Sequence, residues 1–222
     1  MAHHRGPLAA GILSCLLLVA CSTSPASGGP AGSPSVAAPS GGSPGGAAFD
    51  AAAARQYCTD QGGMLVDRVA TYNTNADRSA WVEFAGRETF CEFQSGTGDQ
   101  ATRISVDLVT LYSPEPTLAG VAYLSKVTPK LPPQPSANPA DYNCNQNLGG
   151  TSTFGSGAAG GGWVDTAQPV FVVMDMCTFM DTSAIDAWGI FYYANGTVRG
   201  ADLATKMRYH PGTQGLPAVF GS

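Results

Sequence analysis

The chain has 222 residues and few charges: eleven basic and sixteen acidic side chains give a formal net charge of −5. A negative, charge-poor surface repels phosphate backbones, and no cluster of lysine and arginine in the sequence offsets that repulsion. We therefore expect no nucleic-acid partner.

The first 20 residues are typical of a secretory signal. Basic residues ending at Arg5 precede the apolar run Leu8–Val19, which is shorter than the roughly 20 residues needed to span a bilayer. The run ends in Leu18-Val19-Ala20-Cys21, which resembles the lipobox that is cleaved before its cysteine. We expect cleavage after residue 20 and anchoring to the extracytoplasmic face of the cell membrane through acyl chains on Cys21. The alternative is an ordinary secretory signal that leaves Cys21 unmodified.

Residues 21–47 predict a disordered tether. Ser22–Ala47 consists almost wholly of Ser, Pro, Gly and Ala, with Thr23 and Val36 as the exceptions. Such a segment has too little apolar surface to offset the entropy lost on ordering.

The first folded segment, residues 48–126, predicts short helices and antiparallel strands. A helix is expected over Ala51–Gln61, ended by Gly62-Gly63 in a left-handed cap. A second helix is expected over Pro116–Lys126. Strands are expected between them because apolar and polar residues alternate there, at Met64–Tyr72, Ala80–Phe84, Thr89–Phe93 and Arg103–Tyr112.

Residues 127–137 form a connector, in which Thr128–Pro135 holds four prolines. The second segment, residues 138–222, predicts a similar order: helices over Pro139–Asn147 and Gly200–Arg208, strands over Val170–Met180 and Ile185–Tyr193, and a turn at Asn195-Gly196. The expected fold class is α+β, mainly antiparallel sheet with short helices, in two pseudo-equivalent disulfide-bridged repeats after a disordered tether.

Four cysteines remain once Cys15 leaves with the signal and Cys21 takes the lipid. Four cysteines allow three pairings, but Cys58 to Cys91 and Cys144 to Cys177 are both 33 positions apart. Equal spacing favours one duplicated unit with a bridge inside each copy, in an oxidising compartment. Zinc binding would need closer pairs such as C-x-x-C, which the sequence lacks, so we expect no metal and no cofactor.

The residues around these cysteines also match between the copies. Tyr57-Cys58 with Gly62-Gly63 corresponds to Asn143-Cys144 with Gly149-Gly150, and Val106-Asp107 corresponds to Ile185-Asp186. The second copy, with Asn138-Pro139-Ala140 and Ile185-Asp186-Ala187-Trp188, resembles the DUF333 family of small bacterial lipoproteins, which carries a hemolysin label. The first copy lacks Asn-Pro-Ala and has Val109 where Trp188 stands. The resemblance implies an architecture and assigns no catalytic residue.

Few residues are candidates for catalysis or for binding a metal or ligand. Gly155–Gly160 matches G-x-G-x-x-G, but no strand precedes it and more glycines follow, so a loop is favoured. His210 is the one histidine after the signal, and a surface or capping role is favoured for it. The remaining candidates are four acids that could bind calcium or act as an acid/base pair and three tryptophans that could stack on ligands: Asp165, Asp175, Asp181, Asp186, Trp81, Trp163 and Trp188.

Each of these candidates also has a plain structural role. Asp175 and Asp181 are expected on the solvent face or turn of a strand, Asp186 in a local hydrogen bond, and the tryptophans in packing. We therefore expect a non-catalytic binding or structural module of the cell envelope, with an envelope protein or cell-wall component as partner. The alternative is a carboxylate-dependent hydrolase of envelope polymers, which would need two of these acids in one pocket.

Replacement of the predicted lipid site tests the anchor. Cys21→Ala should move the protein to soluble fractions or stall its maturation, because no other apolar run in the sequence approaches membrane length. Membrane fractionation measures this, with Cys15→Ala in the signal as the matched control that should stay anchored. Unchanged retention of Cys21→Ala would contradict the lipoprotein interpretation.

Overall fold

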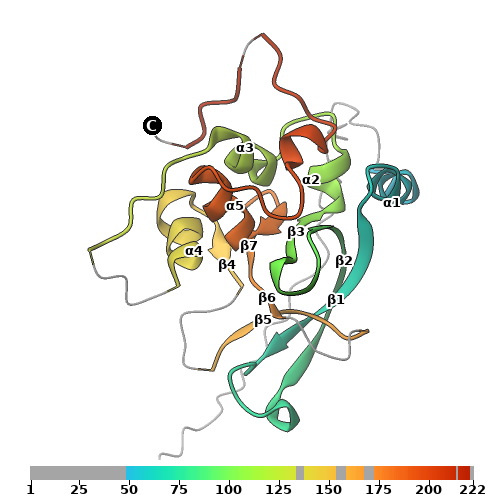
Figure 1. Ribbon diagram of the computed structural model, residues 1–222, viewed down its shortest axis with the longest axis vertical. Helices are drawn as coiled ribbons and strands as arrows, with labels where there is room; N and C mark the ends of the chain where they lie inside the picture. The colour runs from blue at the N-terminus through green and yellow to red at the C-terminus, as the bar shows by residue number, and fades with distance from the viewer. Residues whose placement is uncertain (1–48, 134–137, 154–158, 168–172, 214, 221–222) are drawn as a thin grey trace, which may run out of the picture. The chain divides into compact units, whose positions relative to one another are not determined.

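The computed structural model describes residues 49–133, 138–153, 159–167, 173–213 and 215–220. The predicted signal, Cys21 and the whole tether of residues 21–47 lie outside the described residues, as does most of the Gly155–Gly160 segment. Figure 1 shows the arrangement of the helices and strands.

The first repeat begins with helix α1, for which Asp50 is the N-cap, and Gly62 ends the helical segment with a φ of +82°. A short 3-10 turn, Arg78–Ala80, closes the hairpin between the first two strands, and another, Gly98–Gln100, precedes the third. The elements are α1 (Ala51–Asp60), β1 (Met64–Tyr72), β2 (Val82–Ser95), β3 (Thr102–Asp107), α2 (Leu108–Tyr112) and α3 (Leu118–Ser125).

The second repeat follows the same order with additions. Asn138 caps its first helix, which continues into a π-helical turn at Asn143–Asn147, and a 3-10 turn spans Leu203–Thr205. The elements are α4 (Pro139–Tyr142), β4 (Thr151–Ser152), β5 (Gly161–Asp165), β6 (Val173–Met174), β7 (Met176–Thr178), β8 (Ala184–Asp186) and α5 (Ala187–Ala194).

The predicted strand Arg103–Tyr112 is wrong in its second half, and the predicted strand Ile185–Tyr193 is wrong everywhere after Asp186. Each chain segment leaves the sheet at an aspartate and continues as a helix, α2 after Asp107 and α5 after Asp186. Both carboxylates accept a hydrogen bond from a backbone N–H of the first helical turn, as N-caps do. This capping overrides the β preference of the residues that follow.

Two smaller predictions also differ, and one is confirmed. The strands predicted at Ala80–Phe84 and Thr89–Phe93 form one strand, β2, because Phe84–Gly86 bulges opposite Ala70 and does not interrupt the pairing. Asn195-Gly196 forms a turn, as predicted, at the end of α5. The helix predicted over Gly200–Arg208 is reduced to the short Leu203–Thr205 turn.

All eight strands of the described residues form one antiparallel sheet in the order β4-β7-β8-β3-β2-β1-β5-β6. Both repeats contribute to this sheet, and they meet where Val106 of β3 pairs with Ile185 of β8. The registers align one row of residues across six strands, Leu65–Cys91–Val106–Ile185–Cys177–Ser152. The order of the strands on one side of the Val106–Ile185 pair mirrors the order on the other side. The strands β1-β2-β3 and β4-β7-β8 are therefore related by a pseudo-twofold axis between Val106 and Ile185. The strands β5 and β6 are an addition of the second repeat: β5 pairs with β1, and β6 pairs with β5 at the edge of the sheet.

The five helices pack on one face of the sheet, where the main core lies. Its central side chains, such as Ile104, Val106 and Ile185, are almost fully buried between the sheet and the helices. Stacked rings of Tyr123 and Tyr193, 3.9 Å apart at their centroids, join α3 to α5. Burial of this surface provides most of the driving force for folding.

The other face of the sheet curls around a smaller core. Phe90 of β2 packs against Trp163 of β5 with ring centroids 5.5 Å apart, and Met176 and Ala184 join them from the opposite end of the sheet. Arg68 and Glu92 form a buried ion pair on this face at 2.7 Å. Glu92 also accepts hydrogen bonds from Ser105 and Gln94. Its negative charge is therefore balanced by Arg68, and its carboxylate oxygens have hydrogen-bond partners within the protein.

The two predicted disulfides are present. Cys58–Cys91 ties α1 to β2, and Cys144–Cys177 ties the π-helical turn to β7, with Cα atoms 5.8 and 5.7 Å apart. Neither bridge crosses between the repeats. The second copy has one more residue between its cysteine and its Gly-Gly pair than the first, and the π-helical turn, with a hydrogen bond from Leu148 N–H to Asn143 C=O, accommodates that residue.

The second glycine of each pair is fixed by contact with the disulfide. A Cβ on Gly63 would overlap Cys91 Sγ and lie 3.0 Å from Cys58 Sγ, and one on Gly150 would lie 2.6 Å from Cys177 Sγ. Any side chain at either position would force the bridge away from the sheet.

Substitution of these glycines should therefore destabilise the fold. We expect Gly63→Ala and Gly150→Ala each to lower the free energy of unfolding by about 1–3 kcal/mol, the usual cost of overpacking. Urea unfolding measures this, and Gly212→Ala, where a Cβ meets no atom within 4 Å, is the control that should change stability little. Wild-type stability for both variants would contradict the packing described here.

Candidate functional site

A cavity of about 360 Å³ lies where β1, β4 and β5 approach one another. Its walls are the end of β1, the start of β5 with the glycines before it, and the edge strand β4. The described lining residues are Ala70, Thr71, Tyr72, Phe84, Thr151, Ser152, Thr153, Ala159, Gly160, Gly161, Gly162 and Trp163. No lysine, arginine, aspartate or glutamate is among them.

Three aromatic side chains line the cavity, those of Tyr72, Phe84 and Trp163. Trp163 is half-buried and held by Phe90, whereas Tyr72 and Phe84 are 51% and 54% exposed. Exposed aromatic side chains beside a cavity are a common feature of binding sites, because their large apolar area becomes buried only when a ligand arrives.

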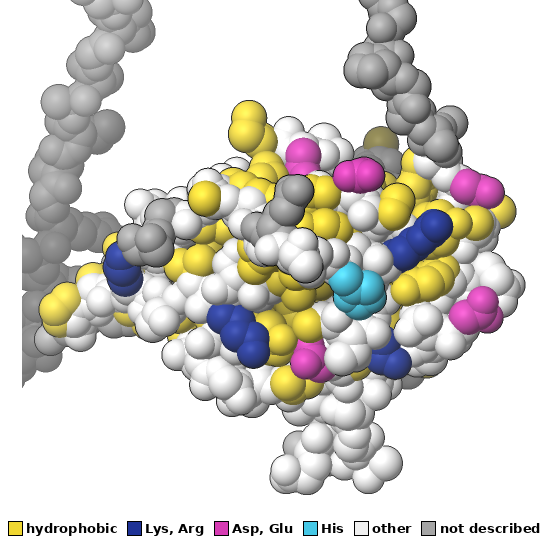
Figure 2. Space-filling view, turned by 90° about the horizontal axis from the view of Figure 1, so that it is seen from above, with side chains coloured by type: hydrophobic (Ala, Val, Ile, Leu, Met, Phe, Trp, Pro, Cys, Tyr) yellow, Lys and Arg dark blue, Asp and Glu magenta, His cyan; other side chains and the backbone are white. Residues whose placement is uncertain are grey.

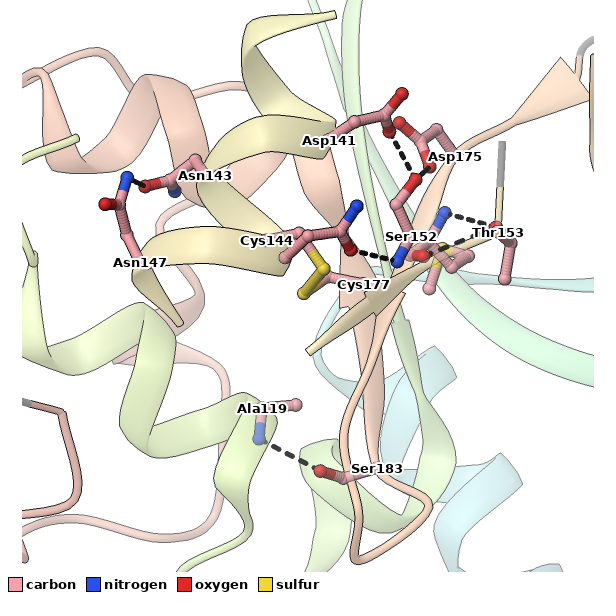
Figure 3. The surroundings of a disulfide bond; sticks show 12 residues. Ala119, Asp141, Asn143, Cys144, Asn147, Ser152, Thr153, Asp175, Cys177 and Ser183 are labelled. Carbon is pink, nitrogen blue, oxygen red and sulfur yellow. Dashed lines mark hydrogen bonds between the residues drawn. A yellow bond between two sulfur atoms is a disulfide. The ribbon is translucent and has the colours of Figure 1, made fainter. Parts of the chain in front are cut away.

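Three hydroxyl groups of the lining, those of Thr71, Ser152 and Thr153, are already engaged. Thr71 donates to the carbonyl of Val69, and the Thr153 hydroxyl accepts a hydrogen bond from Met176 N–H. Ser152 Oγ contacts a carboxylate oxygen of Asp141 and lies 2.8 Å from one of Asp175, as Figure 3 shows beside the second disulfide. The lining therefore offers mainly apolar surface.

The four acids singled out from the sequence do not converge in this cavity. Asp165 accepts a hydrogen bond from Ala167 N–H, and Asp186 caps α5 through Gly189 N–H, which confirms the local bond predicted for it. Asp181 lies exposed in the β7–β8 turn, as predicted, and accepts from Leu118 N–H at the start of α3. Asp175 was predicted on the solvent face or the turn of a strand; it lies between β6 and β7 and is buried, 5% exposed.

The other sequence candidates are dispersed. Trp163 lines the cavity, but the Trp81 indole N–H donates to Ala76 C=O at the hairpin tip, and Trp188 stacks on Tyr192 of α5. His210 is exposed near the C-terminus, away from the cavity lining. Sequence reasoning missed Tyr72, Phe84 and Asp141. Tyr72 and Phe84 lie within predicted strands, and nothing in the sequence indicates that their rings remain half-exposed.

Two buried aspartates are equivalent in the two repeats. Asp107 accepts hydrogen bonds from Thr110 N–H at 2.6 Å and, across the junction of the repeats, from Ala184 N–H at 2.7 Å. Burial raises the pKa of Asp107 and of Asp186 to about 6, against the opposing effect of the N–H donors. Their roles are structural, because each carboxylate caps a helix.

The face shown in Figure 2 carries no strong charge pattern. On the face shown in Figure 2, lysine and arginine side chains are separated by hydrophobic and acidic ones. Among the described residues no cluster of three or more His, Cys, Asp or Glu side chains could hold a metal ion, and no helix is long and apolar enough to cross a membrane.

Comparison with known proteins adds no relative: no family model, curated protein or solved structure matches this chain.

The raised pKa values of Asp107 and Asp186 predict a pH dependence of stability. Their usual value is 3.8, so between about pH 4 and pH 6 the folded chain binds more protons than the unfolded chain. For these two groups the free energy of unfolding must then fall as pH rises from 5 to 7, by on the order of 1–3 kcal/mol per aspartate.

Urea unfolding at pH 5 and pH 7 measures this change. Asp186→Asn is the matched variant, because its side-chain oxygen can still accept from Gly189 N–H but it no longer titrates. The variant should lose less stability than the wild type over this range. An equal loss in both proteins would contradict the assignment of Asp186.

Proposed function

We propose that this protein is a non-catalytic binding module of the cell envelope, held at the extracytoplasmic face of the membrane by lipid on Cys21. Its partner is an envelope protein or cell-wall component that contacts the aromatic cavity. We further propose that it is a two-copy relative of the DUF333 lipoproteins, on the sequence matches around its two disulfides. The tether of residues 21–47 would let the folded part reach partners away from the bilayer.

The proposal rests on one contrast: the described lining of the cavity is uncharged, whereas the acids considered for catalysis are engaged elsewhere. Two half-exposed aromatic side chains and Trp163 border a space with no charged side chain in its described lining. Each acid considered for catalysis is occupied by a cap, a turn or a buried hydrogen bond. Binding needs an apolar concave surface of this kind, whereas acid/base catalysis needs titratable groups that reach the substrate.

A carboxylate-dependent hydrolase is the second candidate, favoured by one arrangement. Asp141 and Asp175 both contact the hydroxyl of Ser152, which lines the cavity. Two carboxylates near one pocket could act as acid and base. Against this role, the two side chains are only 9% and 5% exposed and neither lines the cavity, so a substrate would have to displace Ser152 to reach them.

Site-specific crosslinking tests the binding proposal. A photoreactive benzoylphenylalanine in place of Phe84, introduced into the lipid-anchored protein in native envelopes, should give a discrete adduct, because this ring borders the cavity. The same replacement of Val109, which is 42% exposed on α2, is the matched control and should give none. Adducts identical at both positions, or absent from both, would contradict the proposal.

A parallel assay addresses the hydrolase. Purified peptidoglycan is incubated with the wild-type protein and with Asp175→Asn, and soluble fragments are measured. The binding proposal predicts no release by either protein. Release by the wild type that is lost in Asp175→Asn would replace the proposal with the second candidate.

A further inference from the structure

We infer that the cavity between β1, β4 and β5 binds an uncharged, planar aromatic ring. This inference rests on the proposed binding function and specifies the ligand class. It follows from three features of the cavity: its aromatic side chains, its wall of glycines and the mainly apolar, uncharged surface of its described lining.

Three aromatic side chains line the cavity. Trp163 is fixed from behind by the edge-to-face contact with Phe90, so its position is set before a ligand arrives. Tyr72 and Phe84 are about half-exposed at the cavity. Aromatic rings attract one another in offset or edge-to-face geometry at centroid separations of roughly 4.5–7 Å, which a fourth ring could adopt here.

The glycine wall lets a flat group approach the backbone closely. Gly160 and Gly162 have φ values of +71° and +152°. A Cβ on Gly160 would lie 2.7 Å from the Asn75 side chain, and one on Gly162 would lie 2.7 Å from Met174 O. These positions therefore stay without side chains, and this side of the cavity remains bare backbone.

The polar groups argue against sugars and charged ligands. The hydroxyls of Thr71, Ser152 and Thr153 already have hydrogen-bond partners within the protein. A pyranose has several hydroxyls, and those left unpaired on burial would oppose binding. A charged ligand would find no opposite charge in the described lining. An acyl chain fits the apolarity, but its flexibility makes ordering against flat rings more costly than for a rigid ring.

A set of small ligands tests the inference on the full-length lipidated protein in phosphatidylcholine nanodiscs. Saturation-transfer NMR compares indole, N-acetyltryptophanamide, methyl glucoside and decanol, with empty nanodiscs as the blank for partition into lipid. Indole or N-acetyltryptophanamide should bind more tightly than the other two. Tighter binding of indole would indicate a free small molecule as the natural source of the ring, and tighter binding of N-acetyltryptophanamide a polypeptide side chain.

Variants locate the binding. Phe84→Ala should weaken binding about tenfold, as loss of a ring contact and its buried area implies, and Thr151→Trp should abolish it by filling the cavity from the exposed edge of β4. Val109→Ala is the control that should bind like the wild type. Unfolding midpoints equal to the wild type confirm that the variants fold, and Tyr72→Ala replaces any variant that does not.

The inference is overturned if methyl glucoside or decanol binds more tightly than both ring ligands, or if Phe84→Ala binds them as the wild type does. It is also overturned if no ligand of the set binds. In each of these cases the crosslink at Phe84 still reports separately on the proposed function, so an adduct there would keep the binding module and reject only the aromatic ligand.

Discussion

The row of paired residues that crosses six strands is the constraint on which the rest of the structure depends. It places both disulfides in one line across the sheet, on either side of the Val106–Ile185 pair. Each bridge holds the first helix of its repeat on the sheet, and the buried sulfurs leave no room for a side chain on the second glycine of each pair. Cysteine spacing, glycine pairs and strand register are therefore consequences of one packing arrangement.

The same row explains how two copies form one sheet. An aspartate follows Val106 and another follows Ile185, and each ends its strand by capping a helix. Asp107 also accepts a hydrogen bond from Ala184 of the other repeat, so the capping group of the first copy helps to hold the second in register. Protonation and helix capping at this junction are linked, because both act on the same buried carboxyl groups.

The cavity arises where the two copies differ. In the first repeat a hairpin joins β1 directly to β2, whereas in the second the chain between β4 and β7 includes β5, which pairs with β1 of the first repeat, and β6, which pairs with β5. This addition brings Trp163 and the glycine wall against Tyr72 and Phe84. A strictly symmetric pair of repeats would lack this surface, so the proposed binding site depends on the asymmetry.

The sequence by itself determined the features that depend on local chemistry or on exact spacing. These include α1 with its glycine end, the strand Met64–Tyr72, the α+β class and both disulfides, because caps, alternation and equal cysteine intervals act within short stretches or repeat exactly. The helices after Asp107 and Asp186 depend on local caps that outweigh the β preference of the residues after them. Only the tertiary structure decided that Asp175 is buried and that Tyr72, Phe84 and Trp163 line one cavity. These outcomes depend on which distant strands pair and on which faces remain uncovered, and an amino-acid pattern does not specify such long-range contacts.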